Sequence, residues 1–361
     1  MYGLGDLEEV RVRSFDAGAA LLDRVPGPVA RALSRADVGR GAEAMHTAQL
    51  PALQQQLALR ARVQSIKASS ALEGVVVASD DRADRIIGSS GGPLRTRSEQ
   101  ELAGYRDALD YVWRPGWGPV DVGLVLHLQR LLLAHTVSAG GSFKTEDNLV
   151  VDRAPDGSHV VRFRPVSARD APSATDQLLR AFVAERDADR HHPLLLIGLT
   201  VLDLLVIHPF EDGNGRVARV LTNALLSDAG YGVARYVSLE QLIADSADEY
   251  YATLLSSTHG WHTAEHDPWP WLDYFVRQVG LAYAHFAERV ASTTGAGASK
   301  RARVRRFVLE QAPGRFRISD VRAVVLGVGD GTIRNALNDL RAEGKVEVDG
   351  PGRGAMWTRL G

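Results

Sequence analysis

Apolar residues recur along this chain of 361 residues mainly at the spacing of helices rather than that of strands. The longest apolar run extends from Pro193 to Ile207; it contains Asp203, so it suits a buried core helix and falls short of a membrane span. Gly230 supplies a stop for the helix that follows the run. We therefore predict a mainly all-α fold, in which two core helices are joined by a tight loop. The second helix presents its apolar residues at offsets 0, 3, 4, 7 and 8, on one face: Val217, Val220, Leu221, Ala224 and Leu225.

Two further patterns precede this pair of helices. Residues 50–73 are expected to form a helix, because Leu59, Val63 and Ile66 stand at offsets 0, 4 and 7 and Gly74 follows as a C-cap. The runs 148–152 and 159–163 are rich in strand-forming residues, and Ala-Pro-Asp-Gly-Ser stands between them. This arrangement predicts a β-hairpin.

The character of the chain changes after residues 292–299, a stretch of Ser, Thr, Gly and Ala that we interpret as a linker. Residues 300–361 contain 13 Lys and Arg against 7 Asp and Glu, a net charge of +6, which leaves −8 for residues 1–299 of a total of −2. Three helices are expected, around Val304, after Ser319, and from Thr332 to Gly344, followed by a hairpin of 345–348 and 355–359. This order predicts a small winged-helix (α+β) domain.

The third of these helices is expected to expose side chains that can contact phosphates or base edges. A basic domain of this kind binds nucleic acid or docks a protein, and the residues favour neither. The exposed set would be Arg334, Asn335, Asn338 and Arg341.

Composition bounds the remaining possibilities. Hydrophobic residues make up 45% of the chain, enough for a large core, and the length suits two to three domains. The chain has no cysteine, which excludes disulfides, thiol catalysis and cysteine-ligated metals and fits a cytoplasmic protein. The first fifteen residues contain no apolar signal core, which leads to the same expectation.

The chemistry concentrates in the loop between the two core helices. Gly213, Asn214 and Gly215 stand at the N-terminus of the second helix, where free N–H groups and the helix dipole attract phosphate. Arg216 and Arg219 are three residues apart in the first turn, so we expect them to point the same way and to reach further phosphate oxygens.

Two side chains in the same loop complete a set of chemical roles. Asp212 offers a hard oxygen ligand for Mg²⁺ or Mn²⁺ bound to the phosphates, and His208 can accept a proton from an attacking hydroxyl. A single histidine or glycine pair would indicate no more than a helix-ending turn and a solvated loop. Together the residues predict phosphoryl chemistry on a nucleotide.

The stretch HPFEDGNGRVAR, from His208 to Arg219, resembles the core motif of the Fic family, HPF-x-[D/E]-G-N-G-R-x-x-R, at every fixed position. The resemblance implies a protein adenylyltransferase, which transfers AMP from ATP to a Ser, Thr or Tyr hydroxyl of a target protein. It implies that His208 is the general base and that Asp212 holds the metal ion. Of the phosphate contacts, Gly213, Asn214 and Gly215 would hold the α-phosphate, Arg216 the β-phosphate and Arg219 the γ-phosphate.

A second motif lies at the end of the helix expected at 50–73. Ser69 and Glu73, followed by Gly74, are four residues apart and therefore share a helical face. Alone, this is an ordinary surface helix end. Beside the core motif, it resembles the inhibitory [S/T]-x-x-x-E-[G/N] motif of autoinhibited Fic proteins, which implies that Glu73 pairs with Arg219 and blocks the γ-phosphate site.

The resemblance also implies a division of the chain into domains. It implies an N-terminal helical region (1–110) and a Fic core (111–291) with a flap at 141–166 that binds the target protein by strand addition. The linker and the basic domain follow this core. Self-modification and a homodimer are further expectations. An ordinary structural hairpin is the alternative to the flap.

Two alternative functions stay open. In the first, the enzyme removes AMP, and Glu73 orients a water. In the second, the chain is a DNA-binding regulator in which the Fic site senses a nucleotide. Some Fic relatives transfer phosphate or phosphocholine instead, but Gly213 and Arg216 favour AMP transfer.

Overall fold

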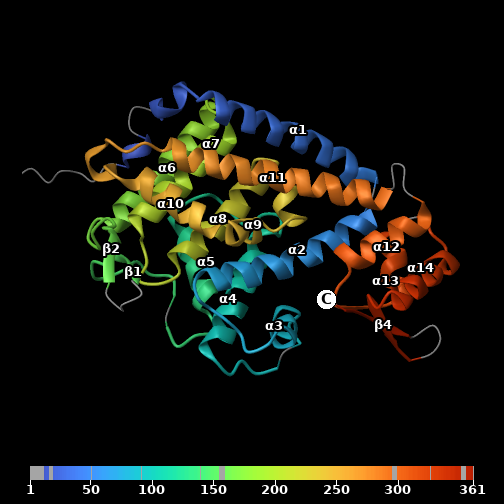
Figure 1. The fold of residues 1–361 in the computed structure, drawn as a ribbon. Coiled ribbons are helices and arrows are strands. Elements are labelled where there is room, and N and C mark those ends of the chain that lie inside the picture. The colour runs from blue at the N-terminus through green and yellow to red at the C-terminus, as the bar shows by residue number, and fades with distance from the viewer. Residues whose placement is uncertain are drawn as a thin grey trace, which may run out of the picture.

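The computed structural model describes residues 12–15, 19–49, 51–90, 92–138, 140–153, 159–294, 299–325, 327–350 and 355–360. Helices dominate, and the strands are confined to one hairpin and one small sheet, so the expectation of a mainly α-helical fold is confirmed (Figure 1). Within these residues, no helix has the length and the apolar character that crossing a membrane requires.

Helix α7 (Pro193–Ile207) is the centre of the core, as its unbroken apolar sequence predicts. Pro193 begins the helix, and the side chain of His192 caps it by accepting a hydrogen bond from Leu194 N at 3.2 Å. The helices α6 (Ala171–Ala188), α8 (Asn214–Asp228) and α11 (Trp269–Thr294) pack around α7. The five apolar residues expected on one face of α8 are all buried, which confirms that prediction.

The N-terminal helices cover this core from two sides. Helix α1 (Gly27–Gln49) runs along α11, whereas α2 (Pro51–Leu72) leads toward α4 (Arg97–Val112) and α8 (Figure 1). Helices α3 (Asp80–Ile87) and α5 (Val122–Leu133) pack against α4. Gly104 allows α4 and α5 to approach closely, because a Cβ there would collide with the carbonyl oxygen of Leu132.

The apolar face expected on α2, with Leu59, Val63 and Ile66, is partly wrong. Ile66 is buried, but the side chain of Leu59 is 66% exposed. The buried face of α2 instead follows Leu53, Leu57 and Ala61, a four-residue spacing that turns Leu59 away from the core. Helix α4 also runs through residues 110 and 111, where we expected a domain boundary.

The hairpin forms with β1 (Val150–Arg153) antiparallel to β2 (His159–Phe163). Its expected turn, residues 154–158, lies outside the described residues. Strand β2 contacts α10 (Ala247–Thr258), which follows α9 (Leu239–Asp245). Short 3-10 helices occur at Arg13–Phe15, Ala20–Asp23, Gly232–Arg235 and Trp261–Thr263.

The C-terminal unit, residues 299–360, contains three helices, α12 (Lys300–Glu310), α13 (Ile318–Val324) and α14 (Asp330–Ala342). Strands β4 (Val346–Asp349) and β5 (Met356–Arg359) form the expected hairpin, and the short β3 (Arg315–Phe316) adds a third strand in the order β3-β5-β4. Helix α14 begins at Asp330 with Gly329 at the N-cap position, so the cap expected at Thr332 is three residues late.

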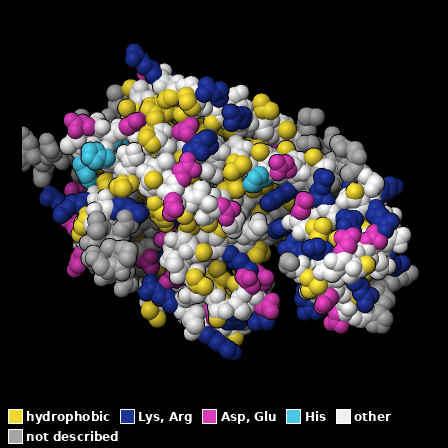
Figure 2. All heavy atoms as spheres, in the orientation of Figure 1, with side chains coloured by type: hydrophobic (Ala, Val, Ile, Leu, Met, Phe, Trp, Pro, Cys, Tyr) yellow, Lys and Arg dark blue, Asp and Glu magenta, His cyan; other side chains and the backbone are white. Residues whose placement is uncertain are grey.

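The C-terminal unit contacts the rest of the molecule mainly through α2 and α11. Helix α11 continues to Thr294, beyond the point at which we expected the linker to begin, and residues 295–298 lie outside the described residues. A groove of about 770 Å³ separates α2 from α12 and α13, and Figure 2 shows the surface hollowed between this unit and the larger body. At its edge, Arg60 of α2 donates to the carbonyl oxygen of Gln311, at the end of α12.

Candidate active site

The loop between α7 and α8 takes its shape from two residues in the left-handed backbone region. His208 ends α7 with φ 51°, and Gly213 precedes α8 with φ 88°. A left-handed conformation is strained for a residue with a Cβ, so a histidine held there marks a position where the surrounding structure sets the backbone. The result is that the side chain of His208 and the N-terminus of α8 open into the same cavity.

The imidazole of His208 has one nitrogen engaged with the backbone of α7. Its Nδ1 lies 3.2 Å from the carbonyl oxygen of Leu205; because a carbonyl only accepts, Nδ1 carries the hydrogen and Nε2 keeps its lone pair. Burial, with a smaller contribution from the nearby cation Lys144, lowers the pKa of His208 to about 4, so the ring is neutral at pH 7.

Two residues of the segment before the hairpin hold this loop in place. The backbone N–H of Lys144 donates to Pro209 O at 2.9 Å, and Asn148 Nδ2 donates to Phe210 O at 3.1 Å. Lys144 Nζ donates to Asn148 Oδ1 at 2.8 Å, and burial lowers the pKa of Lys144 to about 8. Sequence reasoning gave neither residue a role of its own: Lys144 was only a position in the expected flap, and Asn148 was only the start of the first expected strand.

Asn214 closes the loop from the inside. Its Oδ1 accepts from Phe210 N at 2.9 Å, and its Nδ2 donates to Phe210 O at 2.8 Å. The side-chain amide therefore shapes the loop. The backbone of Gly213, Asn214 and Gly215 remains at the wall of the cavity.

The cavity has a volume of about 260 Å³ and a mixed lining. Its charged and polar residues include Glu73, Arg162, His208, Asp212 and Arg219. The apolar and aromatic part of the lining comes from the hairpin, α7 and α10: Val150, Phe163, Leu205, Tyr250, Tyr251, Leu254 and Leu255.

Arg219 is joined to the end of α2 by three hydrogen bonds. Its Nε donates to Ser69 Oγ at 2.8 Å, and its Nη2 donates to Ser69 O at 3.1 Å and to Glu73 Oε1 at 2.7 Å. The pair expected between Glu73 and Arg219 is thus present. A Cβ at Gly215 would collide with Glu73 Oε1, so this carboxylate lies directly over the N-terminus of α8.

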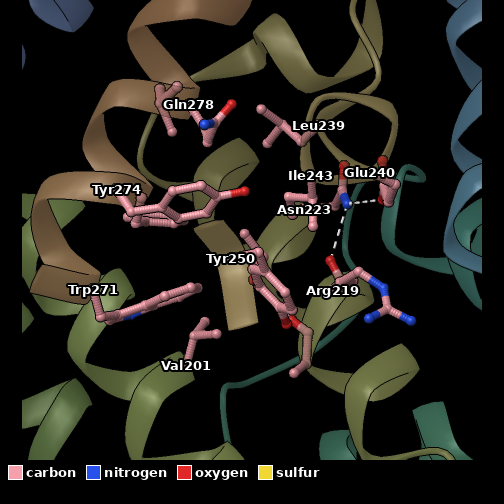
Figure 3. A pocket seen from close by; sticks show the side chains of 14 residues that line it. Val201, Arg219, Asn223, Leu239, Glu240, Ile243, Tyr250, Trp271, Tyr274 and Gln278 are labelled. Atoms are coloured by element: carbon pink, nitrogen blue, oxygen red, sulfur yellow. Dashed lines mark hydrogen bonds between the residues drawn. The ribbon is translucent and has the colours of Figure 1, made fainter. Parts of the chain in front are cut away.

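A buried polar network supports Arg219 from behind, beside a small apolar pocket (Figure 3). Asn223 Nδ2 donates to Arg219 O at 3.0 Å and to Glu240 Oε1 at 2.8 Å, and Tyr105 donates its hydroxyl to the same carboxylate at 3.0 Å. In Figure 3, the guanidinium of Arg219 points away from Trp271 and the apolar lining. The network fixes the backbone from which Arg219 reaches the cavity.

Arg216 and Arg219 do not point the same way, so that expectation is wrong. Arg216 donates from Nη1 to Glu101 Oε2 at 2.8 Å and from Nη2 to Asp212 Oδ1 at 2.9 Å, and only 3% of its side chain is exposed. Positions three apart on a helix differ by about 60° in direction. Here α4 supplies the partner of Arg216 while α2 supplies the partners of Arg219. The structure does not bring the Arg216 side chain to the cavity.

Asp212 suits a divalent cation that shares its other ligands with a nucleotide. Its carboxylate is 43% exposed and lines the cavity, next to the N-terminus of α8. A magnesium ion commonly takes one or two carboxylates and completes its shell with phosphate oxygens and waters. The part of the chain that the structure describes contains no group of three or more metal-ligating side chains, so a cation here would depend on the phosphates.

Comparison with known proteins gives a family and two sets of relatives. Residues 119–226 match the Fic/DOC family. The chain is similar to "Protein adenylyltransferase Fic" of Nematostella vectensis, with 28% identity over 170 residues, which cover 44% of this chain and 34% of that protein. The protein of the same name from Drosophila melanogaster is 31% identical over 134 residues, which cover 36% of this chain and 25% of that protein. The chain spans a quarter to a third of these relatives.

Solved structures extend the likeness over most of the chain. A Fic family protein from Desulfovibrio desulfuricans G20 aligns with a TM-score of 0.61 and 19% identity, covering 94% of this chain and 98% of that one. Fic-1 from C. elegans aligns with a TM-score of 0.55 and 19% identity, covering 72% of each chain. At these identities the likeness concerns the fold.

Proposed function

This chain carries a Fic-family domain over residues 119–226, and on that premise we propose that it is a protein adenylyltransferase that transfers AMP from ATP to a protein hydroxyl. The observation that carries the proposal is a neutral, buried His208 that shares one cavity with the N-terminus of α8. The relatives named protein adenylyltransferases support it.

In the proposed reaction, the hydroxyl oxygen of the target attacks the α-phosphorus, and the bond to the bridging oxygen breaks. Pyrophosphate leaves with that electron pair, and the hydroxyl proton passes to Nε2 of His208. The amides of Gly213, Asn214 and Gly215 would stabilise the charge on the α-phosphate, because a helix N-terminus attracts anions. Tyr250 and Tyr251, which line the cavity, would pack against the adenine ring.

Asp212 would hold Mg²⁺ or Mn²⁺ in this proposal. When bound, the cation neutralises charge on the phosphates. Arg219 would contact the γ-phosphate once its guanidinium is released from α2, and Arg216 would act through Asp212.

Glu73 is proposed to inhibit the reaction. Its carboxylate occupies the space over Gly215 and bonds to Arg219, so it both repels the triphosphate and removes a phosphate ligand. Ser69 contributes by holding Arg219 in the same orientation. Inhibition and phosphate binding therefore compete for one guanidinium.

We place the target protein at the hairpin β1–β2, whose second strand contributes Phe163 to the cavity wall. An exposed strand edge can bind an extended peptide through backbone hydrogen bonds. The protein's own hydroxyl groups and a second copy of the chain are further candidate partners.

The test uses ATP labelled in the α-phosphate or in the γ-phosphate, with a cell lysate and the Glu73→Gly protein. We expect the α-label alone to enter protein, and the His208→Ala, Glu73→Gly double variant to transfer none. If the γ-label enters protein instead, the enzyme transfers phosphate rather than AMP, and the proposal is wrong. Release of AMP from a modified protein by wild type, lost in Glu73→Gly, would favour the removal reaction.

A second candidate function concerns the C-terminal unit. Its three helices and the β4–β5 hairpin support the expected winged helix, and the four polar residues expected on α14 are exposed: Arg334, Asn335, Asn338 and Arg341. We propose that α14 contacts nucleic acid. Anisotropy titration with random duplex DNA should show affinity that falls steeply with salt, and Arg334→Ala should weaken it. Absence of binding at low salt would favour a protein partner.

A further inference from the structure

Four charged side chains form a closed ring at the edge of the proposed active site. Arg97 and Glu101 come from α4, and Asp212 and Arg216 come from the loop and the first turn of α8. Each arginine bonds to both carboxylates. Arg97 Nη2 donates to Asp212 Oδ2 at 3.0 Å, and Arg216 Nη2 donates to Asp212 Oδ1 at 2.9 Å. The two oxygens of Asp212 are therefore each bonded to a different arginine.

The four members differ in burial, and this difference decides which of them can move. The side chains of Glu101 and Arg216 are 6% and 3% exposed, so each needs the other to compensate for a buried charge. The side chain of Arg97 is 70% exposed, and its ion pair with Asp212 is solvated on one side. An exposed pair of this kind contributes little and is readily exchanged for another partner. Arg97 is therefore the replaceable member of the ring.

Both Arg97 and Glu101 lie outside residues 119–226, so the ring joins the family domain to a helix that precedes it. Glu101 anchors the arrangement: it accepts from Arg216 Nη1 and from Arg97 Nε, which orients both guanidinium groups toward Asp212. Arg97 is held near Oδ2 by its own helix, four residues before Glu101, and needs no other element to stay there.

We propose that Arg97 is a positioning residue that occupies Asp212 Oδ2 in the absence of a divalent cation and competes with that cation for the carboxylate. This inference rests on the proposed role of Asp212 as a metal ligand. The guanidinium holds the carboxylate in place beside the cavity, so the ligand is in position before the nucleotide arrives. The same contact weakens cation binding, because the cation must displace Arg97 or bind beside its positive charge.

The test measures Mn²⁺ binding directly, by the loss of the free-ion electron paramagnetic resonance signal. The 361-residue chain carries Glu73→Gly in every sample, and α,β-methylene-ATP supplies the phosphates without transfer. Arg97→Gln is compared with Arg95→Gln, a matched control that removes an exposed arginine of the same segment without touching the ring. We expect Arg97→Gln to lower the dissociation constant for Mn²⁺ about two- to fivefold, the range for losing one exposed ion pair. Arg95→Gln should leave the dissociation constant unchanged.

The outcomes separate this inference from the proposed function. If Arg97→Gln binds Mn²⁺ no more tightly than Arg95→Gln while Asp212→Ala still weakens binding, competition by Arg97 is refuted and the metal site stands. If Asp212→Ala binds Mn²⁺ as tightly as its parent, the metal role of Asp212 fails and this inference fails with it. Thermal unfolding of each variant confirms that the compared proteins are folded.

Discussion

The contact between Glu73 and Arg219 yields the sharpest prediction. Glu73→Gly removes a carboxylate that bonds to Arg219 at 2.7 Å and lies over Gly215. We expect AMP transfer to rise well above wild type, because the guanidinium and the space at the α8 N-terminus become available to the triphosphate. The substituted residue is followed by Gly74 at the helix end, so little helical structure is lost.

The size of the expected gain in AMP transfer depends on how deeply Arg219 and Glu73 are buried. The side chain of Arg219 is 5% exposed and that of Glu73 is 34% exposed, so the pair lies between interior and surface. Two unit charges 4 Å apart interact by ~4 kcal/mol at an effective dielectric constant of 20, and desolvation offsets part of that. A net bias of ~1–3 kcal/mol remains, which corresponds to a roughly 5- to 150-fold gain.

The variant Glu73→Gln separates the effect of the Glu73 charge from the effect of its volume. Glu73→Gln keeps the volume over Gly215 and removes the charge, so its activity should lie between wild type and Glu73→Gly. The assay is the initial rate of α-label incorporation, with kcat and the KM for ATP measured separately for the three proteins. Equal rates in all three would refute the inhibitory role. A gain in Glu73→Gln equal to that in Glu73→Gly would show that charge alone inhibits.

The remaining predictions concern the base, the metal and the far end of α2. His208→Ala should lower transfer by ~10²–10⁴-fold while ATP still binds in calorimetry; wild-type labelling would refute the assignment. With the pKa of His208 lowered to about 4, the acid limb of kcat/KM should lie near pH 4. The unfolded chain takes up this proton first, so the free energy of unfolding should fall as pH drops from 6.5 toward 4, by up to about 3 kcal/mol, and less in His208→Ala. Excess chelator should abolish transfer, and Asp212→Ala should impair nucleotide use more than thermal stability. Arg60→Ala, which frees α2 from the end of α12, should raise labelling in wild type but not in Glu73→Gly, whereas exposed Gln55→Ala changes neither. If Arg60→Ala raises labelling in wild type and in Glu73→Gly alike, the contact of Arg60 does not act through Glu73.

Where the sequence pattern failed, the reason was packing between distant segments. Leu59 had the spacing of a core residue, yet the partners of α2 lie on the face of Leu53 and Leu57. Lys144 carried no motif at all, and its importance comes from the loop at Pro209 that it supports.

The sequence by itself determined the helices and the chemistry of the loop from His208 to Arg219. Helical periodicity, caps and glycine conformations are local properties, so α7, α8 and the turn between them could be read from neighbouring residues. The tertiary structure decided which charges meet. The pair of Arg219 with Glu73, 146 positions away, was implied only by the family resemblance, and no sequence signal indicated the pair of Arg216 with Glu101, 115 positions away. Their directions differ because α2 and α4 approach α8 from different sides, and that approach is set by packing rather than by any residue nearby in the chain.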